Sequence, residues 1–154
     1  VEETELQPDL PDADFGGKEF VFYSKSVDDY AEWGNVDIYT EEMNAEPIND
    51  AVFERNMFVE EKYNCKIVDL PSTGRNMATT ARKDIMAGSA TYHAMTADMT
   101  ETATVAAQNL LLDLKTIPNL DLDKVWWDQK GNEQMTLNNK LKEQMLSSDD
   151  NKEK

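Results

Sequence analysis

The residue types that usually carry catalysis are scarce in this sequence. His93 is the only histidine and Cys65 the only cysteine. A nucleophile needs a base beside it, and a structural zinc ion needs several cysteine or histidine ligands. His93 falls inside a predicted strand, where an ordinary structural role is favoured, and Cys65 is expected to be a buried, inert thiol. The sequence therefore predicts neither a nucleophilic catalytic centre nor a zinc site.

Carboxylates are the abundant chemical group, since 31 Asp and Glu against 15 Lys and Arg give a formal net charge of −16. A glycosidase needs two carboxyl groups held about 5–10 Å apart in a cleft, whereas here the acidic residues are scattered. We therefore predict no enzyme activity, no metal and no cofactor. The negative charge also disfavours nucleic acid and anionic lipid as partners. The close acidic pairs lack the glycine and terminal glutamate of a calcium loop: Asp12 with Asp14, Asp28 with Asp29, and Asp121 with Asp123.

Aromatic residues set among polar ones suggest a different chemistry. Tyr30 and Trp33 stand in a polar stretch, residues 27–35, just after the first predicted strand. An aromatic ring packs against the C–H face of a sugar, while neighbouring carboxylates and amides bind its hydroxyls. Packing onto the protein core is the alternative for Trp33, and also for Trp126 and Trp127.

The elements that must position these residues are read from periodicity. Runs rich in aromatic and β-branched residues predict strands at 19–23, 65–70 and 92–97. A further strand at 134–137 and a short helix at 140–146 are predicted near the end. Helices are predicted between the strands: one from Pro47 with Ile48, Val52, Val59 and Tyr63 on its apolar stripe, one from Thr79 to Met86 before Gly88, and one from a Thr100 cap towards Leu111.

Strands that alternate with helices imply βαβ units and a parallel sheet. We expect an α/β fold of three αβα layers, with strand order 2-1-3, because the first strand is the most apolar and hence central. Residues 15–146 form this lobe, with a βαβαβα core at 15–114 and an irregular, Trp-containing extension at 115–146. Residues 1–14 are expected to be a flexible acidic leader, and residues 147–154 a disordered tail.

In a parallel α/β sheet the ligand crevice lies beyond the carboxyl ends of the strands. The candidate ligand-binding residues therefore come from the three loops that follow the strands, with one tryptophan from the extension. They are Ser24, Asp28, Tyr30 and Trp33; Ser72, Thr73 and Arg75; Asp98 and Thr100; and Trp127.

Several short motifs follow one another between residues 15 and 140. Gly-Gly-Lys-Glu-Phe at 16–20 precedes Ile-Asn-Asp-Ala-Val-Phe-Glu-Arg-Asn at 48–56 and Val-Glu-Glu-Lys-Tyr-Asn-Cys-Lys-Ile at 59–67. Leu110 to Leu114, Ile117-Pro118, Asp121-Leu122 and Trp126-Trp127-Asp128-Gln129 follow. Together they resemble the bacterial extracellular solute-binding proteins of ABC importers, of the carbohydrate-type family 1. Val125 departs from the proline usual there, and residues 142–145 replace an expected aromatic strand.

The resemblance implies a non-catalytic N-terminal lobe, or a truncated member, of a receptor that traps a solute between two lobes by hinge closure. It implies a carbohydrate as the solute, an ABC permease as partner of the full-length protein, and a monomer. It also implies an extracellular, cell-surface lipoprotein, attached to the membrane only through a lipid anchor upstream of Val1, after removal of a leader. The alternative is a truncated cell-surface interaction domain that binds a protein partner and no small solute.

Overall fold

The computed structural model describes residues 10–28, 37–74, 76–137 and 140–141. Most of the predicted leader and all of the predicted tail lie outside the described residues. In the described part of the chain, no helix is long and apolar enough to cross a membrane.

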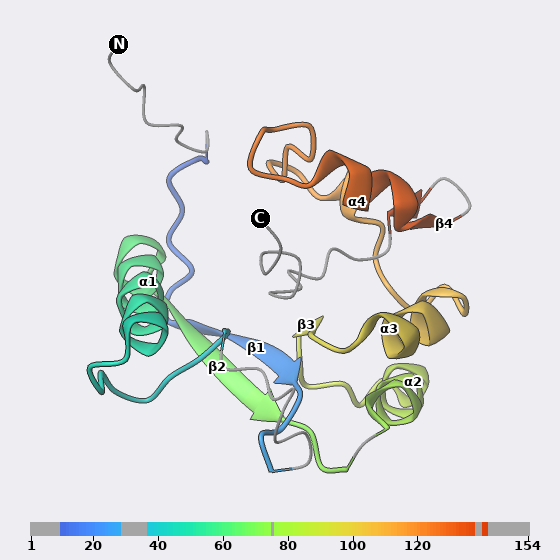
Figure 1. The fold of residues 1–154 in the computed structure, drawn as a ribbon, viewed down its shortest axis with the longest axis horizontal. Helices are drawn as coiled ribbons and strands as arrows, with labels where there is room; N and C mark the ends of the chain where they lie inside the picture. Colours follow the sequence, from blue (N-terminus) through green and yellow to red (C-terminus); the bar gives the residue numbers. More distant parts are fainter. Residues whose placement is uncertain (1–9, 29–36, 75, 138–139, 142–154) are drawn as a thin grey trace.

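A three-stranded parallel sheet lies at the centre of the fold (Figure 1). Its strands are β1 (Lys18–Ser24), β2 (Cys65–Pro71) and β3 (Ala94–Met95), in the order β2-β1-β3. β1 pairs along its whole length with β2, and its Phe22 and Tyr23 pair with the two residues of β3. The predicted mixed α/β class and the strand order 2-1-3 are confirmed.

β3 is shorter than the predicted strand at 92–97. Beside it, the His93 N–H donates to the Val21 carbonyl and the Thr96 N–H to the Tyr23 carbonyl, both at 2.8 Å. The Val21 N–H donates in turn to Nδ1 of His93 at 3.0 Å. Because an imidazole nitrogen accepts this bond in place of a backbone carbonyl, the regular ladder stops here. His93 thus has a structural contact, as predicted.

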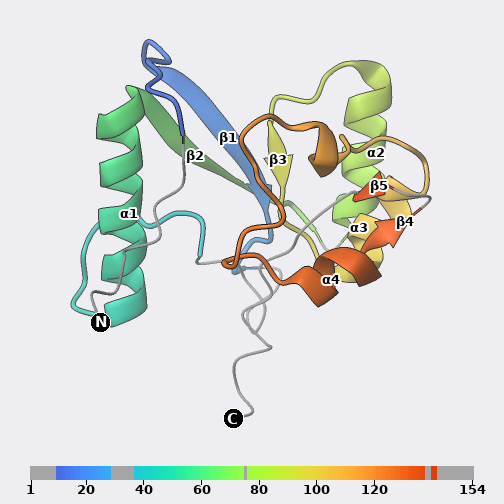
Figure 2. The same cartoon turned by 90° about the horizontal axis from the view of Figure 1, so that it is seen from above.

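Helices cover both sides of the sheet (Figure 2). α1 (Pro47–Tyr63) lies on one side and packs against β2, while α2 (Met77–Ala87) and α3 (Met99–Ala106) lie together on the other. The main core fills the space between the sheet and this second pair. It consists of Tyr23, Met77, Ala78, Ala81, Ala97 and Val105.

α1 begins at Pro47, whose fixed φ and missing N–H suit the first turn of a helix. Val52 and Asn56 are buried, and Val59 is half-buried. Ile48 was expected on the same stripe, but it is 67% exposed, so that part of the prediction is wrong. Its first-turn position borders a surface hollow formed with the preceding loop, and the buried face begins one turn later.

The start of α3 also differs from the prediction. Asp98, and not Thr100, is the N-cap, because its backbone is extended and its side chain accepts the Glu101 N–H. Thr100 lies inside the first turn, which leaves its side chain exposed. The helix ends at Ala106, before the predicted region of Leu111.

The extension contains η1 (Leu114–Thr116), α4 (Gln129–Gln134) and a hairpin of β4 (Thr136–Leu137) with β5 (Lys140–Leu141). α4 was not predicted. Residues 140–141 were expected to begin a helix and instead form β5, because antiparallel pairing with β4 overrides a weak local helix preference. The remainder of that predicted helix lies outside the described residues.

Candidate functional site at the carboxyl edge of the sheet

Hydrogen bonds join the loops that follow β1 and β2. The Ser72 N–H donates to the Ser24 carbonyl at 2.8 Å, and the Ser26 N–H donates to Oγ of Ser72 at 3.1 Å. The Asp28 N–H donates to Oγ of Ser26 at 3.1 Å. Three predicted residues, Ser24, Ser72 and Asp28, are therefore tied into one network at one edge of the sheet.

Ser24 and Ser72 are buried, with exposed fractions of 0% and 3%. The Ser24 hydroxyl donates to Oδ1 of Asp69, a neighbouring β2 side chain, at 2.5 Å. Burial raises the pKa of Asp69, and the hydrogen bond from Ser24 opposes that rise. The two buried serines hold the loops in place, whereas Asp28 and Thr73 are exposed on the surface.

Asp98 connects the loop after β3 to the same edge. One of its carboxylate oxygens, Oδ2, lies 3.8 Å from Nζ of Lys25, which directly follows β1. The Lys25 side chain is 14% exposed and that of Asp98 44% exposed. All three loops thus meet at the carboxyl edge, as the parallel topology requires.

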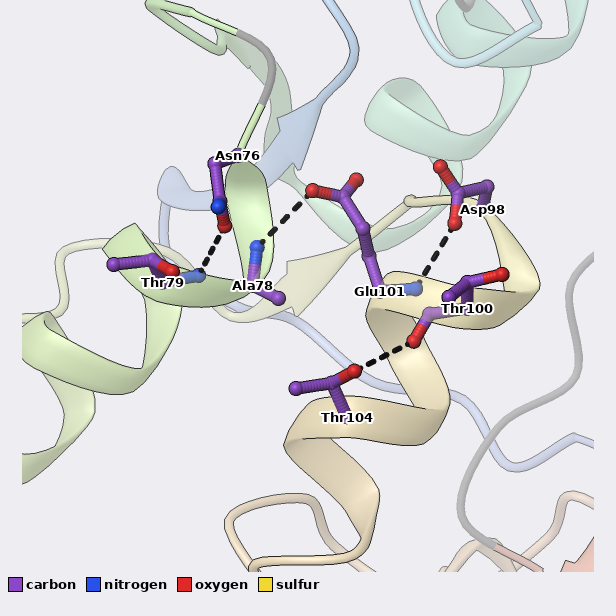
Figure 3. A pocket seen from close by; sticks show the side chains of 7 residues that line it. All are labelled: Asn76, Ala78, Thr79, Asp98, Thr100, Glu101 and Thr104. Atoms are coloured by element: carbon purple, nitrogen blue, oxygen red, sulfur yellow. Dashed lines mark hydrogen bonds between the residues drawn. The ribbon is translucent and has the colours of Figure 1, made fainter.

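A hollow of about 410 Å³ opens beside Asp98, where the N-termini of α2 and α3 converge (Figure 3). Six of its seven lining residues carry a hydroxyl, amide or carboxylate group, and two of these, Asp98 and Thr100, were predicted from the sequence. The lining residues are Asn76, Ala78, Thr79, Asp98, Thr100, Glu101 and Thr104.

Glu101 joins the two helices across this hollow. Its Oε1 accepts the N–H groups of Met77 at 2.7 Å and Ala78 at 3.4 Å, the first two residues of α2. Oδ1 of Asn76 accepts the next N–H, that of Thr79, at 2.9 Å. The side chain of one helix therefore helps to cap the other, and Figure 3 shows Glu101 reaching from α3 towards Ala78.

The second carboxylate oxygen of Glu101 is the unusual atom of the site. Oε2 is buried and has no hydrogen-bond partner among the described residues. A buried acceptor without a donor is costly, because its lost hydration is not replaced. Protein atoms cover Oε2, so this cost belongs to the packing of Glu101 between the two helices.

The other predicted contacts are placed differently. Trp127 is half-buried, and its indole N–H donates to the Leu120 carbonyl at 3.0 Å, which binds it within the extension. Trp126, its neighbour, is 41% exposed. Tyr30, Trp33 and Arg75 lie outside the described residues.

Sequence reasoning missed Lys25, Asn76, Glu101 and Thr104. The positions of Asn76 and Glu101 at the starts of helices could have indicated them. Residues at the start of a helix that follows a parallel strand lie at the same edge of the sheet as the loops. Asp98-Met99-Thr100-Glu101 has the spacing of a capping box, in which Glu101 would bond within its own helix. In the structure the Glu101 side chain instead accepts N–H groups of the neighbouring helix, α2, and this contact depends on tertiary packing.

In residues 10–28, 37–74, 76–137 and 140–141, no group of three or more His, Cys, Asp or Glu side chains is arranged to hold a metal ion.

Comparisons of the chain with protein-family models, with curated proteins and with solved structures found no match.

Proposed function

We propose that this chain binds a small solute, with a carbohydrate as the class that suits it best, at the carboxyl edge of its sheet. In this proposal it is the non-catalytic N-terminal lobe of an extracellular, lipid-anchored receptor that serves an ABC importer. The second lobe of such a receptor would close over the solute by hinge motion.

The observation that carries the proposal is a hollow between the N-termini of α2 and α3, at the edge of the sheet where the three loops meet. Asp98 and Thr100 supply a carboxylate and a hydroxyl to its wall, and Asn76 supplies an amide. Such groups bind the hydroxyls of a polyol by hydrogen bonds, which fix its orientation. Ser24 and Ser72 take the role of supports in this scheme, since both are buried and bonded to protein atoms.

A single lobe buries only part of a ligand. The favourable contacts then offset little of the cost of association, so we expect dissociation constants on the order of millimolar or weaker for oligosaccharides. Dissociation constants in the micromolar range for the isolated chain would contradict this half-site argument.

Thr100→Val tests the role of the hollow. The variant keeps the shape of the side chain and removes one hydroxyl from the wall, so oligosaccharide binding should weaken about threefold to tenfold. Thr91→Val is the matched control, because Thr91 is exposed and lies in the loop before β3. Affinities from NMR titration, with thermal unfolding of each variant, decide the matter. Equal weakening in both variants would count against the hollow as the binding site.

A protein-binding role is the second candidate, favoured by the apolar residues that α1 exposes. Ile48 is 67% exposed, Phe58 64% and Met57 50%. Ile48→Ser and Phe58→Ser should leave saccharide binding unchanged if the first proposal holds. The alternative gains if these variants abolish a complex with another cell-surface protein while no saccharide binds the wild-type chain.

A further inference from the structure

We propose that a hollow between residues 39–46 and the start of α1, which we call the α1 hollow, docks a basic segment of a partner protein in which Lys or Arg side chains flank an aliphatic one. The α1 hollow lies beside α1, across the sheet from α2 and α3 (Figure 2). This docking goes beyond the proposed function, since solute binding at the carboxyl edge of the sheet neither requires nor excludes it.

The α1 hollow brings apolar and acidic side chains together in one depression of about 520 Å³. Its apolar members are Tyr39 and Ile48, which are 41% and 67% exposed. Its charged members are Glu41, Glu42 and Glu46, and no Lys or Arg side chain of the described residues lines it. A partner that covers the apolar side chains and supplies positive charge is therefore complementary to this surface.

Hydrogen bonds from α1 hold the segment that forms the wall of the α1 hollow (Figure 1). Nδ2 of the buried Asn56 donates to the Ile38 carbonyl, and Nδ2 of Asn49 donates to the Glu42 carbonyl, both at 2.8 Å. The apolar side chains of this segment do not anchor it in the core, since Met43, for example, is 50% exposed. The wall is thus formed before a partner arrives, which lowers the entropy lost on docking.

The charge of the α1 hollow is not neutralised from within the fold. Its three carboxylates form no hydrogen bond or ion pair within the described residues. Two cations near residues 37–39 are engaged elsewhere, because Arg55 donates to the Asp37 carbonyl and Lys66 is paired with Glu60. The positive end of the α1 dipole already has a carboxylate, Asp50, in its first turn. A cation from outside therefore meets an attractive field.

The exposure of the apolar side chains favours a peptide segment over a small cation. A small amine would pair with a carboxylate and leave most of Ile48 and Tyr39 in water, whereas an aliphatic side chain between two basic ones covers them. A second copy of this chain is disfavoured, because each copy has a formal net charge of −16.

The first test uses the wild-type chain and three capped peptides. Lys-Leu-Arg-Leu-Lys has both required features, Lys-Ser-Arg-Ser-Lys lacks the aliphatic side chains, and Glu-Leu-Glu-Leu-Glu lacks the positive charge. In NMR titrations the first should shift the amides of Tyr39, Glu42 and Ile48 and bind at least about fivefold more tightly than the second. The acidic peptide should shift none of these amides. Raising the salt from about 0.02 M to about 0.5 M should weaken the binding of the first peptide, because exposed charges are screened.

The second test separates the α1 hollow from the general acidity of the chain. Glu41→Gln combined with Glu42→Gln should weaken the binding of Lys-Leu-Arg-Leu-Lys about threefold to tenfold at low salt. Glu54→Gln combined with Glu61→Gln, at exposed positions of α1 outside the hollow, removes the same charge and should change the affinity much less.

Ile48→Ser tests the apolar contact and should also weaken the binding of Lys-Leu-Arg-Leu-Lys about threefold to tenfold. Met86→Ser is the matched control, because Met86 is 66% exposed on α2 and lies outside the α1 hollow. Thermal unfolding should show that every variant is folded, since each changed side chain is exposed.

The proposal is overturned if the two double variants lose affinity equally, or if the serine-containing peptide binds as tightly as the leucine-containing one, because attraction to the acidic chain as a whole then accounts for the binding. It is also overturned if no peptide shifts the amides of the α1 hollow. Shifts of these amides on raising the protein concentration alone would assign the surface to a second copy instead. Each of these results leaves the proposed solute site standing, because saccharide titrations report on the other side of the sheet.

Discussion

Asp69 carries a carboxylate into the partly buried face of the sheet, where the Ser24 hydroxyl binds it. Burial raises its pKa in the folded state, so the folded protein holds more protons than the unfolded chain at pH values just above the normal Asp range. Its charge therefore costs stability near pH 7, and this cost disappears as the pH falls and the group becomes protonated.

Asp69→Asn should raise the melting temperature at pH 7, because the amide oxygen still accepts the Ser24 bond and no charge is buried. The gain should shrink as the pH is lowered towards 4. Asp123→Asn, at an exposed position, controls for the general benefit of removing one negative charge from so acidic a chain. Thermal unfolding at several pH values measures both, and a lower melting temperature for Asp69→Asn at pH 7 would refute this reading of the site.

At the scale of single residues, part of the candidate site could be predicted from the sequence. Asp98 and Thr100 follow a strand, and the topology alone brings them to the edge where the hollow lies. The sequence did not reveal that the Ser24 hydroxyl would donate its hydrogen bond to Asp69, or that Glu101 would cap the neighbouring helix. Both depend on which side chains of different elements meet after packing, and no local pattern encodes such meetings.

Between elements, Glu60 links α1 to β2. Its two oxygens accept the Ile67 N–H at 2.7 Å and Nζ of Lys66 at 2.6 Å. Partial burial alone would raise its pKa, but the hydrogen bonds from Lys66 and Ile67, with the lysine charge, bring the pKa below the usual range. A lowered carboxyl pKa stabilises the fold above the pKa of the unfolded chain, and this contribution is lost as the pH falls through the folded value.

Glu60→Gln should therefore destabilise the protein by about 1 kcal/mol at pH 7, because the ion pair is lost while one hydrogen bond is kept. Glu61→Gln, next in the chain and exposed, should change little. Urea unfolding at pH 7 and near pH 3 gives the comparison. The difference between wild type and Glu60→Gln should shrink at the lower pH, and a loss of equal size at both would show that the charge is not responsible.

The elements themselves were predicted best where local signals agreed. Pro47 at a helix start, Gly88 at a helix end and the apolar run around Phe20 each have one favoured structure, and all three elements form as expected. β3 and the hairpin of β4 with β5 have weak propensities, so partners in space decided their extent. Ile48 shows a further limit, since periodicity gives the phase of a helix but not where its buried face begins.

For the whole molecule, the order β2-β1-β3 places three polar loops at one edge and the exposed apolar residues of α1 on the far side of the sheet from α2 and α3 (Figure 2). These two surfaces correspond to the two candidate functions. A measurement that reports on both surfaces at once therefore distinguishes between the two candidate functions.

The most direct test is an amide shift map of the isotope-labelled chain with maltotriose, cellotriose and mannotriose added to tens of millimolar. If the account holds, at least one trisaccharide shifts the amides of Thr73, Met77, Ala78, Thr100 and Glu101 together, while the amides of Ile48 and Phe58 stay in place. Shifts confined to α1, or no shifts with any of the three sugars, would contradict solute binding at the carboxyl edge of the sheet.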